Sequence, residues 1–321
     1  MPEANARPLI SIVVCTRDRP DSLGATLDSL AAQKYPAFEL VLVDQSRGEE
    51  TRRLVESRAA ELPALRYLHL DRAGLSRAYN AGVGASAGEL LAFTDDDVVA
   101  PEDWLANIAD AFAARPEVGL LYGQVLIPPE LAKRENVEGV TPALPIPRRR
   151  LLDRRHGFEV FGMGANFAAR RTLFHKVGGF DQVLGGGGPL QSSQDFDFGY
   201  RVFKRGATIL LEPGVIVYHY GFRSQAEWPA TLRSYGIGVG GFYFKHVRMG
   251  DLYAARLLLG ALLSSAIRWA GKLARRQPAA GQWTFLVNIL AGIRTSTRFA
   301  IDRRLGLYVD TPLRRPAKQA L

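Results

Sequence analysis

The sequence predicts an α/β protein with a mainly parallel sheet that is covered by helices on both faces. Through residues 9–125, short apolar runs alternate with stretches in which apolar residues recur at helical spacing. The runs are apolar almost throughout, which is typical of strands whose two faces are both buried. Ligands of such sheets bind beyond the carboxyl ends of the strands, so functional residues are expected there.

The elements of this first part are expected to follow one another as strand and helix in turn. Strands are expected at residues 9–15, 38–44, 65–70, 89–94 and 118–125. Helices are expected at residues 21–33, 49–62, 76–87 and 101–115. Pro101 begins the last of these helices, at a position where proline is favoured.

The pattern changes after residue 125. Residues 126–160 are rich in Pro and Arg and predict an irregular excursion, whereas residues 194–206 predict a helix and residues 207–219 two short strands. The loop at residues 184–193 contains four consecutive glycines, and we interpret it as a lid. Beyond Arg223 the spacing predicts longer helices, in which "GIGVGG" (236–241) is interpreted as a site of tight helix packing rather than a dinucleotide-binding turn.

Composition indicates a globular protein, because 47% of the 321 residues are hydrophobic. The single cysteine, Cys15, excludes an intramolecular disulfide and a multi-cysteine zinc site. The first ten residues lack the apolar segment of a secretory signal, so a cytoplasmic location is expected.

The net charge of +9 is concentrated near the carboxyl end. Residues 245–321 contain 14 Lys or Arg and three Asp, which leaves a charge of about −2 on residues 1–244. A near-neutral first part argues against binding of nucleic-acid phosphates as the main function.

The stretch "LLAFTDDDVVAPEDW" (90–104) places three consecutive carboxylates at the end of an expected strand. Adjacent carboxylates repel one another unless solvent or a cation compensates their charge. Mg²⁺ or Mn²⁺ would do so, because these ions take carboxylate oxygens together with the phosphate oxygens of a substrate. The alternative is a solvated acidic turn that helps to start the next helix.

Several segments together resemble family 2 glycosyltransferases of the A-type fold. They are "SIVVCTRDRPDSL", "VLVDQS", "GLSRAYNAGVGASAGELLAFTDDDVVAPEDW", "ANFAARRTLFHKVGGFDQ" and "QDFDFGYRVFKRG", in that order, from about residue 9 to 223. The resemblance implies a nucleotide-diphospho-sugar transferase-like fold with a catalytic domain at residues 1–223. Its donor half would be about residues 1–125 and its acceptor half about 126–223, followed by a basic helical region at 224–321.

The resemblance also implies roles for residues that match the motifs of the family. Thr16 and Asp44 would line the nucleoside pocket, although Asp44 could instead cap the turn that comes after it. Thr94 stands where the family usually has its first Asp. Asp95 would therefore lie beside the ribose and phosphates, with Asp96 and Asp97 as metal ligands. Tyr79 stands where an arginine is frequent, so Arg77 is the candidate for the diphosphate contact, with a solvent-facing helix residue as the alternative.

Two further residues complete the expected site. Asp195, in a Gln194-Asp195 pair where the family has Glu-Asp, is the candidate base that takes the proton of the acceptor hydroxyl; otherwise it stabilises the start of its helix. His219 ends an expected strand and is a candidate metal ligand or phosphate contact, or else a structural histidine.

These observations predict a metal-dependent, inverting hexosyltransferase. It would use Mn²⁺ or Mg²⁺, a nucleotide-sugar donor, and a glycan, lipid-linked or polysaccharide acceptor. The apolar blocks at 257–267 and 283–293 are shorter than a membrane span and are flanked by arginines, so they are expected to lie at the inner face of the membrane or to pack on the core. The alternative is a non-catalytic nucleotide- or nucleic-acid-binding protein that uses its basic tail.

Overall fold

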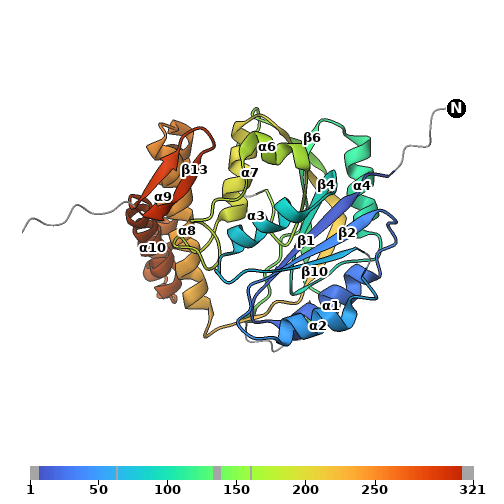
Figure 1. Ribbon diagram of the computed structural model, residues 1–321. Helices are drawn as coiled ribbons and strands as arrows, with labels where there is room; N and C mark the ends of the chain where they lie inside the picture. The colour runs from blue at the N-terminus through green and yellow to red at the C-terminus, as the bar shows by residue number, and fades with distance from the viewer. Residues whose placement is uncertain (1–6, 63, 133–138, 160, 313–321) are drawn as a thin grey trace, which may run out of the picture. The chain divides into compact units, whose positions relative to one another are not determined.

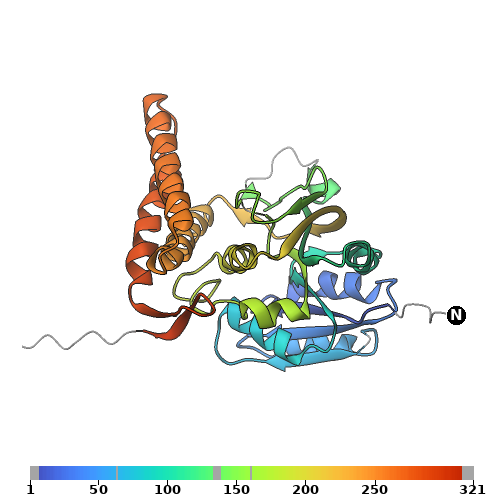
Figure 2. The ribbon, with the colours of Figure 1, turned by 90° about the horizontal axis from the view of Figure 1, so that it is seen from above.

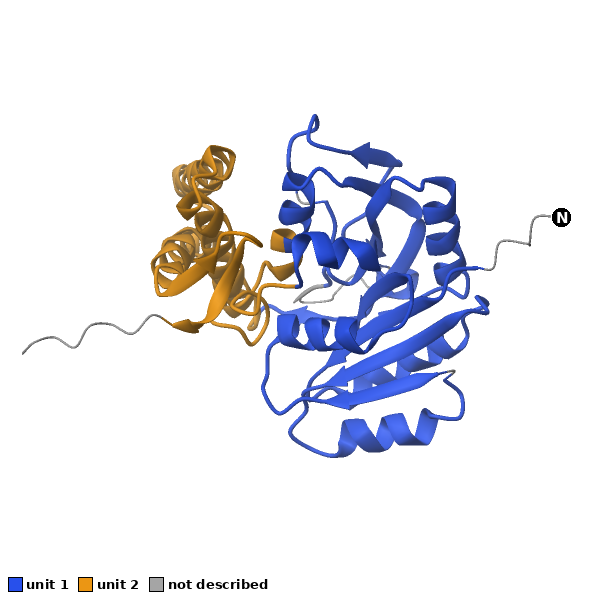
Figure 3. Cartoon of the chain, turned by 45° about the horizontal axis from the view of Figure 1, so that its top comes forward, with its two compact units in different colours: residues 1–179, 198–225 blue, residues 180–197, 226–321 orange. Residues whose placement is uncertain are grey.

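The computed structural model describes residues 7–62, 64–132, 139–159 and 161–312. The chain forms two compact units (Figure 3). Unit 1 comprises residues 1–179 and 198–225, and unit 2 comprises residues 180–197 and 226–321. This division differs from the predicted boundary near residue 223 because the segment 180–197 belongs with the C-terminal helices.

Unit 1 is built on a mixed sheet, which is nine-stranded within the described residues (Figure 1). Its order is β3-β2-β1-β4-β9-β6-β10-β5, with β8 paired to β10. Strand β1 pairs parallel with β2 and β4, β2 pairs parallel with β3, and β6 pairs parallel with β10. Strand β9 lies between β4 and β6 and is antiparallel to both. The strands are β1 (Ile10–Thr16), β2 (Phe38–Asp44), β3 (Leu65–His69), β4 (Leu90–Asp95), β5 (Val98–Val99), β6 (Val118–Leu126), β8 (Arg150–Leu152), β9 (Asn166–Arg170) and β10 (Thr208–His219).

Helices join these strands, and the predicted α/β fold class is confirmed. They are α1 (Pro20–Ala31), α2 (Glu50–Arg58), α3 (Leu75–Ala85), α4 (Trp104–Ala114), α5 (Pro129–Ala132), α6 (Arg171–Val177) and α7 (Gln194–Lys204). A short pair, β7 (Gly139–Val140) and β11 (Arg223–Ser224), lies outside the main sheet.

The two faces of the sheet are buried by different helices, because successive side chains of a strand point to opposite sides. Ile12 and Leu42 belong to a large buried cluster that includes Leu27 of α1. Their neighbours Val41 and Val43 belong to a second cluster with Ala78 of α3. Burial on both faces explains why these strands are apolar at nearly every position. The sequence predicted this burial.

One prediction for this unit was wrong. Residues 207–219 form a single strand, β10, and not two. Its pairing with β6 is irregular between Glu212 and Ile216, where Pro213 and Gly214 interrupt the apolar pattern. Proline in a strand is tolerated at such bulges because it lacks the N–H that a regular ladder requires.

Unit 2 is mainly helical (Figure 2). It contains α8 (Trp228–Arg248), α9 (Leu252–Ala274), α10 (Ala280–Ser296) and a hairpin of β12 (Phe299–Asp302) and β13 (Leu307–Pro312). The helix α9 has 23 residues and a mean hydropathy of 1.3 in its most apolar window, so by length and composition it could cross a membrane. The expectation that this segment is too short for a span was wrong on length, because the helix extends beyond the apolar block at both ends.

The helices α8 and α10 approach each other through glycines. A Cβ at Gly240 would lie 2.0 Å from the carbonyl oxygen of Ile289, and a Cβ at Gly292 would lie 2.1 Å from that of Ile237. Backbones this close leave no room for any side chain. The "GIGVGG" segment therefore serves helix packing, as predicted.

A buried ionic cluster holds the segment 180–197 to the C-terminal helices of unit 2. The Nζ atom of Lys245, which is fully buried, lies 2.7 Å from Oδ2 of Asp181 and 2.6 Å from Oδ1 of Asp197. Nε2 of His246 lies 3.0 Å from the same oxygen of Asp197, and the backbone N–H of Tyr308 donates to Asp181. Removal of one partner from such a cluster leaves an uncompensated buried charge.

The glycine-rich loop is held by its own backbone. Gly185 N–H donates to the carbonyl oxygen of Ser192, and Leu190 N–H donates to that of Val183. Leu190 is buried, and its side chain lies where a Cβ on Gly241 of α8 would be. In this structure the segment therefore has a defined path supported within unit 2, and the interpretation as a lid receives no support from it.

We predict that Gly240→Ala destabilises unit 2 by about 1–3 kcal/mol, because the added methyl group forces α8 and α10 apart. The measurement is urea unfolding followed by far-ultraviolet circular dichroism. Gly260→Ala in α9 is the matched control: a Cβ there meets nothing within 4 Å, and alanine favours the helix by up to about 1 kcal/mol. Equal unfolding midpoints for the two variants would contradict the close approach.

Candidate functional site

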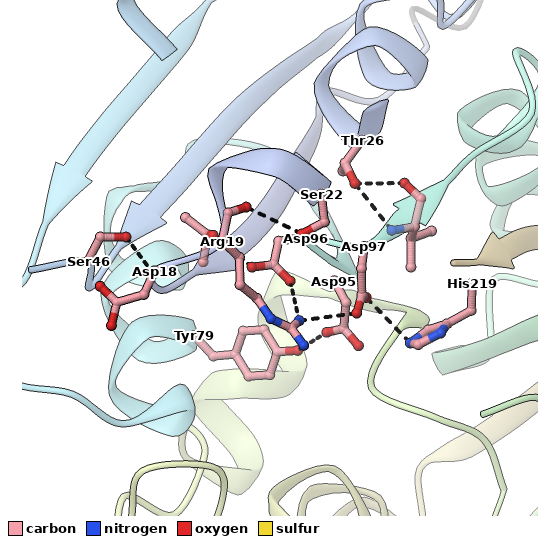
Figure 4. Close-up of polar contacts among 12 residues, drawn as sticks. Asp18, Arg19, Ser22, Thr26, Ser46, Tyr79, Asp95, Asp96, Asp97 and His219 are labelled. Atoms are coloured by element: carbon pink, nitrogen blue, oxygen red, sulfur yellow. Dashed lines mark hydrogen bonds and ion pairs between the residues drawn. The ribbon is translucent and has the colours of Figure 1, made fainter. Parts of the chain in front are cut away.

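The three consecutive carboxylates lie in a tight turn at the carboxyl edge of the sheet. Asp95 ends β4, and Asp96 and Asp97 form the turn into the short strand β5. The hydroxyl of Thr26 on α1 donates to the carbonyl oxygen of Val98 and accepts from its N–H, which fixes the turn against α1 (Figure 4). The turn is therefore held on both sides by regular structure.

His219 reaches this turn because of strand pairing. The end of β10 pairs antiparallel with β5, and His219 is opposite Val98. Its Nε2 atom lies 3.4 Å from Oδ1 of Asp97, and the N–H of Tyr220 donates to the carbonyl oxygen of Asp97. A Cβ at Gly221 would lie 2.3 Å from Oδ2 of Asp97, so a glycine is required beside this carboxylate.

Asp96 is bound by groups from the first strand-to-helix connection. The hydroxyl of Thr16, at the end of β1, donates to its Oδ2 at 2.7 Å, and the guanidinium of Arg19 donates to its Oδ1 at 3.0 Å. The same nitrogen of Arg19 lies 3.1 Å from Oδ2 of Asp97, so one guanidinium bridges two carboxylates (Figure 4). Arg19 was not among the predicted residues. It lies at the carboxyl edge, like Thr16, and that position could have identified it.

A candidate cation-binding group is formed by Asp95, Asp97 and His219. One ligand atom from each lies within 4.8 Å of the others. Among the described residues, Oδ1 of Asp97 is buried and accepts no hydrogen bond. A buried carboxylate oxygen without a donor is costly, and a hard divalent ion bound by oxygen and imidazole ligands would satisfy it. This group differs from the predicted one by having Asp95 in place of Asp96.

Burial governs the protonation of the site. It lowers the pKa of His219, against the opposing effect of Asp97, so the imidazole is neutral and able to bind a metal at neutral pH. Burial also raises the pKa of Asp96, although the hydrogen bonds from Thr16 and Arg19 act in the other direction. The pKa of the Cys15 thiol is raised by burial and by the carboxylates of Asp95 and Asp96, so Cys15 stays protonated.

Asp44 lies at the end of β2, directly beside the end of β1, in register with Thr16. It is fully buried. Its Oδ1 accepts from the N–H of Ser46 at 2.7 Å, and its Oδ2 accepts from the hydroxyl of Tyr67 at 2.6 Å. The first of these bonds is the turn-capping role that was an alternative for Asp44. Each oxygen has a second lone pair, so the capping bond leaves a role toward a nucleoside open.

The two α3 residues that the sequence analysis considered, Arg77 and Tyr79, differ in burial. Tyr79, the residue in place of the family's arginine, is buried and donates its hydroxyl to Oδ1 of Asp95 at 3.3 Å. Arg77 lies two residues earlier on the helix and is half-buried. Neither the contact of Tyr79 with the acidic turn nor that of Arg19 was predicted.

Asp195, the candidate base, lies in the first turn of α7 in unit 2. Its Oδ1 accepts from the N–H of Phe196 at 3.0 Å, as expected of a carboxylate at a helix start. The side chain is half-buried, and Asp197 in the same turn is held by the buried Lys245. The first turn of the helix, which carries Asp195, is therefore anchored to α8 through Asp197.

Known proteins resemble this chain in sequence. The glycosyl transferase family 2 profile matches residues 11–178. The chain is 25% identical over 238 residues to the glucosyl-dolichyl phosphate glucuronosyltransferase of Haloferax volcanii, covering 71% of this chain and 75% of that protein. It is 31% identical over 233 residues to the O-antigen biosynthesis protein RfbC of Myxococcus xanthus, covering 66% of this chain and only 17% of that protein.

Solved structures show the same fold. The mannosyltransferase PcManGT from Pyrobaculum calidifontis, solved in complex with GDP-Man and Mn²⁺, superposes with a TM-score of 0.60 at 19% identity, over 91% of this chain and 88% of that one. TarS of S. aureus superposes with a TM-score of 0.54 at 20% identity, over 72% of this chain and 39% of that one. With a family match over more than half of its length and the fold of A-type glycosyltransferases, this chain belongs to glycosyltransferase family 2.

Proposed function

We propose that this glycosyltransferase is metal-dependent and inverting, and that it moves a sugar from a nucleotide-sugar donor to a hydroxyl acceptor. The observation that carries the proposal is the group of Asp95, Asp97 and His219, with the unsatisfied buried oxygen of Asp97 among its ligand atoms. Membership in the family favours this reaction over the nucleic-acid-binding alternative.

The donor diphosphate would bind at the acidic turn. Bound Mn²⁺ or Mg²⁺ supplies neutralising charge to the departing diphosphate. The chain contributes Asp95, Asp97 and His219 as ligands of the ion. Arg19, whose side chain is half-exposed, is a further residue that we assign to the phosphates beside Arg77, because its guanidinium is at the turn.

The nucleoside is assigned to the edge formed by Thr16 and Asp44, at the ends of two adjacent parallel strands. Two solved neighbours are in complex with GDP-Man and with UDP-GlcNAc, and we propose a donor of the same class here. Asp96 would act indirectly by holding Thr16 and Arg19 at the site.

Asp195 is proposed as the base that accepts the proton of the acceptor hydroxyl during attack on the anomeric carbon. A single carboxylate suffices for a direct displacement, and direct displacement inverts the anomeric configuration. Relatives named for a dolichyl phosphate sugar and for O-antigen biosynthesis support a lipid-linked glycan or a polysaccharide as the acceptor. Such an enzyme would act on the cytoplasmic side of the membrane.

The metal group is tested by Asp97→Asn. Because the substitution removes one ligand charge, we expect the affinity for nucleoside diphosphates in Mn²⁺ to fall at least about tenfold, or about 1.4 kcal/mol. Wild-type protein should be stabilised by a nucleoside diphosphate only with Mn²⁺ or Mg²⁺ present, as measured by thermal unfolding with and without a chelator. Asp110→Asn, an exposed acid on α4, is the matched control and should behave as wild type.

The base is tested by Asp195→Asn in a screen of nucleotide sugars that monitors release of nucleoside diphosphate. Loss of a general base typically costs about 10²- to 10⁴-fold in rate, so we expect turnover to fall by at least 10²-fold. Metal-dependent nucleotide binding should stay unchanged, because Asp195 is assigned to the acceptor. Full transfer activity in this variant would show that another group accepts the proton.

A further inference from the structure

The helix α9 exposes an apolar side over its whole length. Its exposed large residues include Leu252 (84% exposed), Leu259 (56%), Leu263 (53%) and Ile267 (69%). Their spacing of seven, four and four places them along one side of the helix. The opposite side, with Ala254, Leu258 and Ser265, is the buried one. A helix of a water-soluble domain has the reverse pattern on its outer side.

This apolar side continues onto α10. The rings of Trp269 on α9 and Trp283 on α10 are in contact, with centroids 4.9 Å apart. Trp283, Val287 and Leu290 are exposed and succeed one another along one side of α10, while Ile289 on the other side is buried. We define the α9–α10 surface by seven residues: Leu252, Leu259, Leu263, Ile267, Trp283, Val287 and Leu290.

The charges around the α9–α10 surface have one sign. From Leu252 to Ile301 the sequence contains no acidic residue but seven basic ones: Arg256, Arg268, Lys272, Arg275, Arg276, Arg294 and Arg298. An anionic surface is complementary to this segment, and each nearby Lys or Arg strengthens the attraction. A second copy of the chain is a poorer partner, because the same cations would face each other without carboxylates from this segment to pair them.

Two further features favour a lipid surface. Trp269 and Trp283 have large apolar rings and a polar N–H, a combination that is enriched where hydrocarbon meets water. Arg256 lies within the apolar side of α9, and a long arginine can keep its stem in apolar surroundings while its charge reaches the headgroups. Both are typical of helices that lie in the plane of an interface.

The charges of α9, together with its one buried side, argue for this orientation over a span. Although its length and composition permit a span, the side with Ala254, Leu258 and Ser265 is buried within unit 2. Only 11% of the apolar window of α9 is buried, so charge is the stronger argument. Arg256 and Arg268 leave 11 residues between them, fewer than a span requires, and a helix surrounded by lipid would need apolar residues all round.

We propose that the α9–α10 surface binds an anionic phospholipid bilayer, with α9 lying in the plane of the interface. This inference goes beyond the proposed reaction, because it concerns unit 2 alone and requires no turnover. It gives the enzyme a place at the membrane even without a lipid-linked acceptor.

The test is co-sedimentation of the full chain with vesicles of phosphatidylglycerol and phosphatidylcholine in equal parts, compared with pure phosphatidylcholine. We expect roughly tenfold or stronger partition to the anionic vesicles, weakened by high salt that screens the attraction. The double variant Leu263→Glu/Ile267→Glu should lose roughly tenfold or more in partition, because it places two carboxylates on the apolar side. Val309→Glu, an exposed apolar residue on β13, is the control and should bind as wild type.

Three results would overturn the proposal. Equal binding of the double variant and the control would show that the surface is not the contact. A dimer in light scattering that the double variant converts to a monomer would show that a second copy covers it. Retention in membranes after alkaline carbonate extraction would show that α9 spans the bilayer. Thermal unfolding of the double variant checks that it is folded, and nucleotide stabilisation is measured separately, so failure here leaves the proposed reaction standing.

Discussion

Repulsion among three adjacent carboxylates is the constraint on which unit 1 depends. Asp96 and Asp97 are buried, and each must have partners that the turn itself does not supply. Arg19 binds both of them, Thr16 binds Asp96, and Tyr79 binds Asp95. These partners come from the end of β1, the start of α1 and from α3, so the sheet order that brings those elements together also makes the acidic turn possible.

The contacts described above compensate the negative charge of the acidic turn only in part, and the proposed binding of a cation depends on this. One guanidinium faces two carboxylates, His219 is neutral because burial lowers its pKa, and Oδ1 of Asp97 has no hydrogen bond among the described residues. A cation shared with a diphosphate is the complement that we propose, and Arg19, which contacts two carboxylates of the turn, is a residue that we assign to the phosphates.

Local sequence patterns were enough to predict the parallel part of the sheet. Apolar strands with helices between them indicated it, and the position of Asp44 and Asp95 at strand ends placed them at one edge. The antiparallel insertion of β9 between β4 and β6 was not predicted, because the hydrophobic pattern of a strand does not show which distant strand it pairs with. For the same reason, Asp96 rather than Asp95 was predicted in the candidate cation-binding group. Which of the two carboxylates lies near Asp97 and His219 depends on the direction of each side chain in the turn and on the pairing of β5 with β10.

The contact of Arg19 with the turn was missed for a related reason. Its position before Pro20 indicated only the start of a helix, and its two carboxylate partners are far away in the sequence. Helix packing at Gly240, in contrast, was predictable, because closely spaced glycines on a helix indicate that another backbone approaches it.

The buried lysine of unit 2 has a consequence for how such enzymes can be recombined. Lys245 on α8 holds Asp181 and Asp197, and these two residues bracket the segment that contains Asp195. A chimera joined at residue 225 would separate the lysine from its aspartates and pair each half with a foreign counterpart. The loop before α7 and the C-terminal helices therefore form one exchangeable module, although residues 198–225, which belong to the other unit, lie between them in the chain.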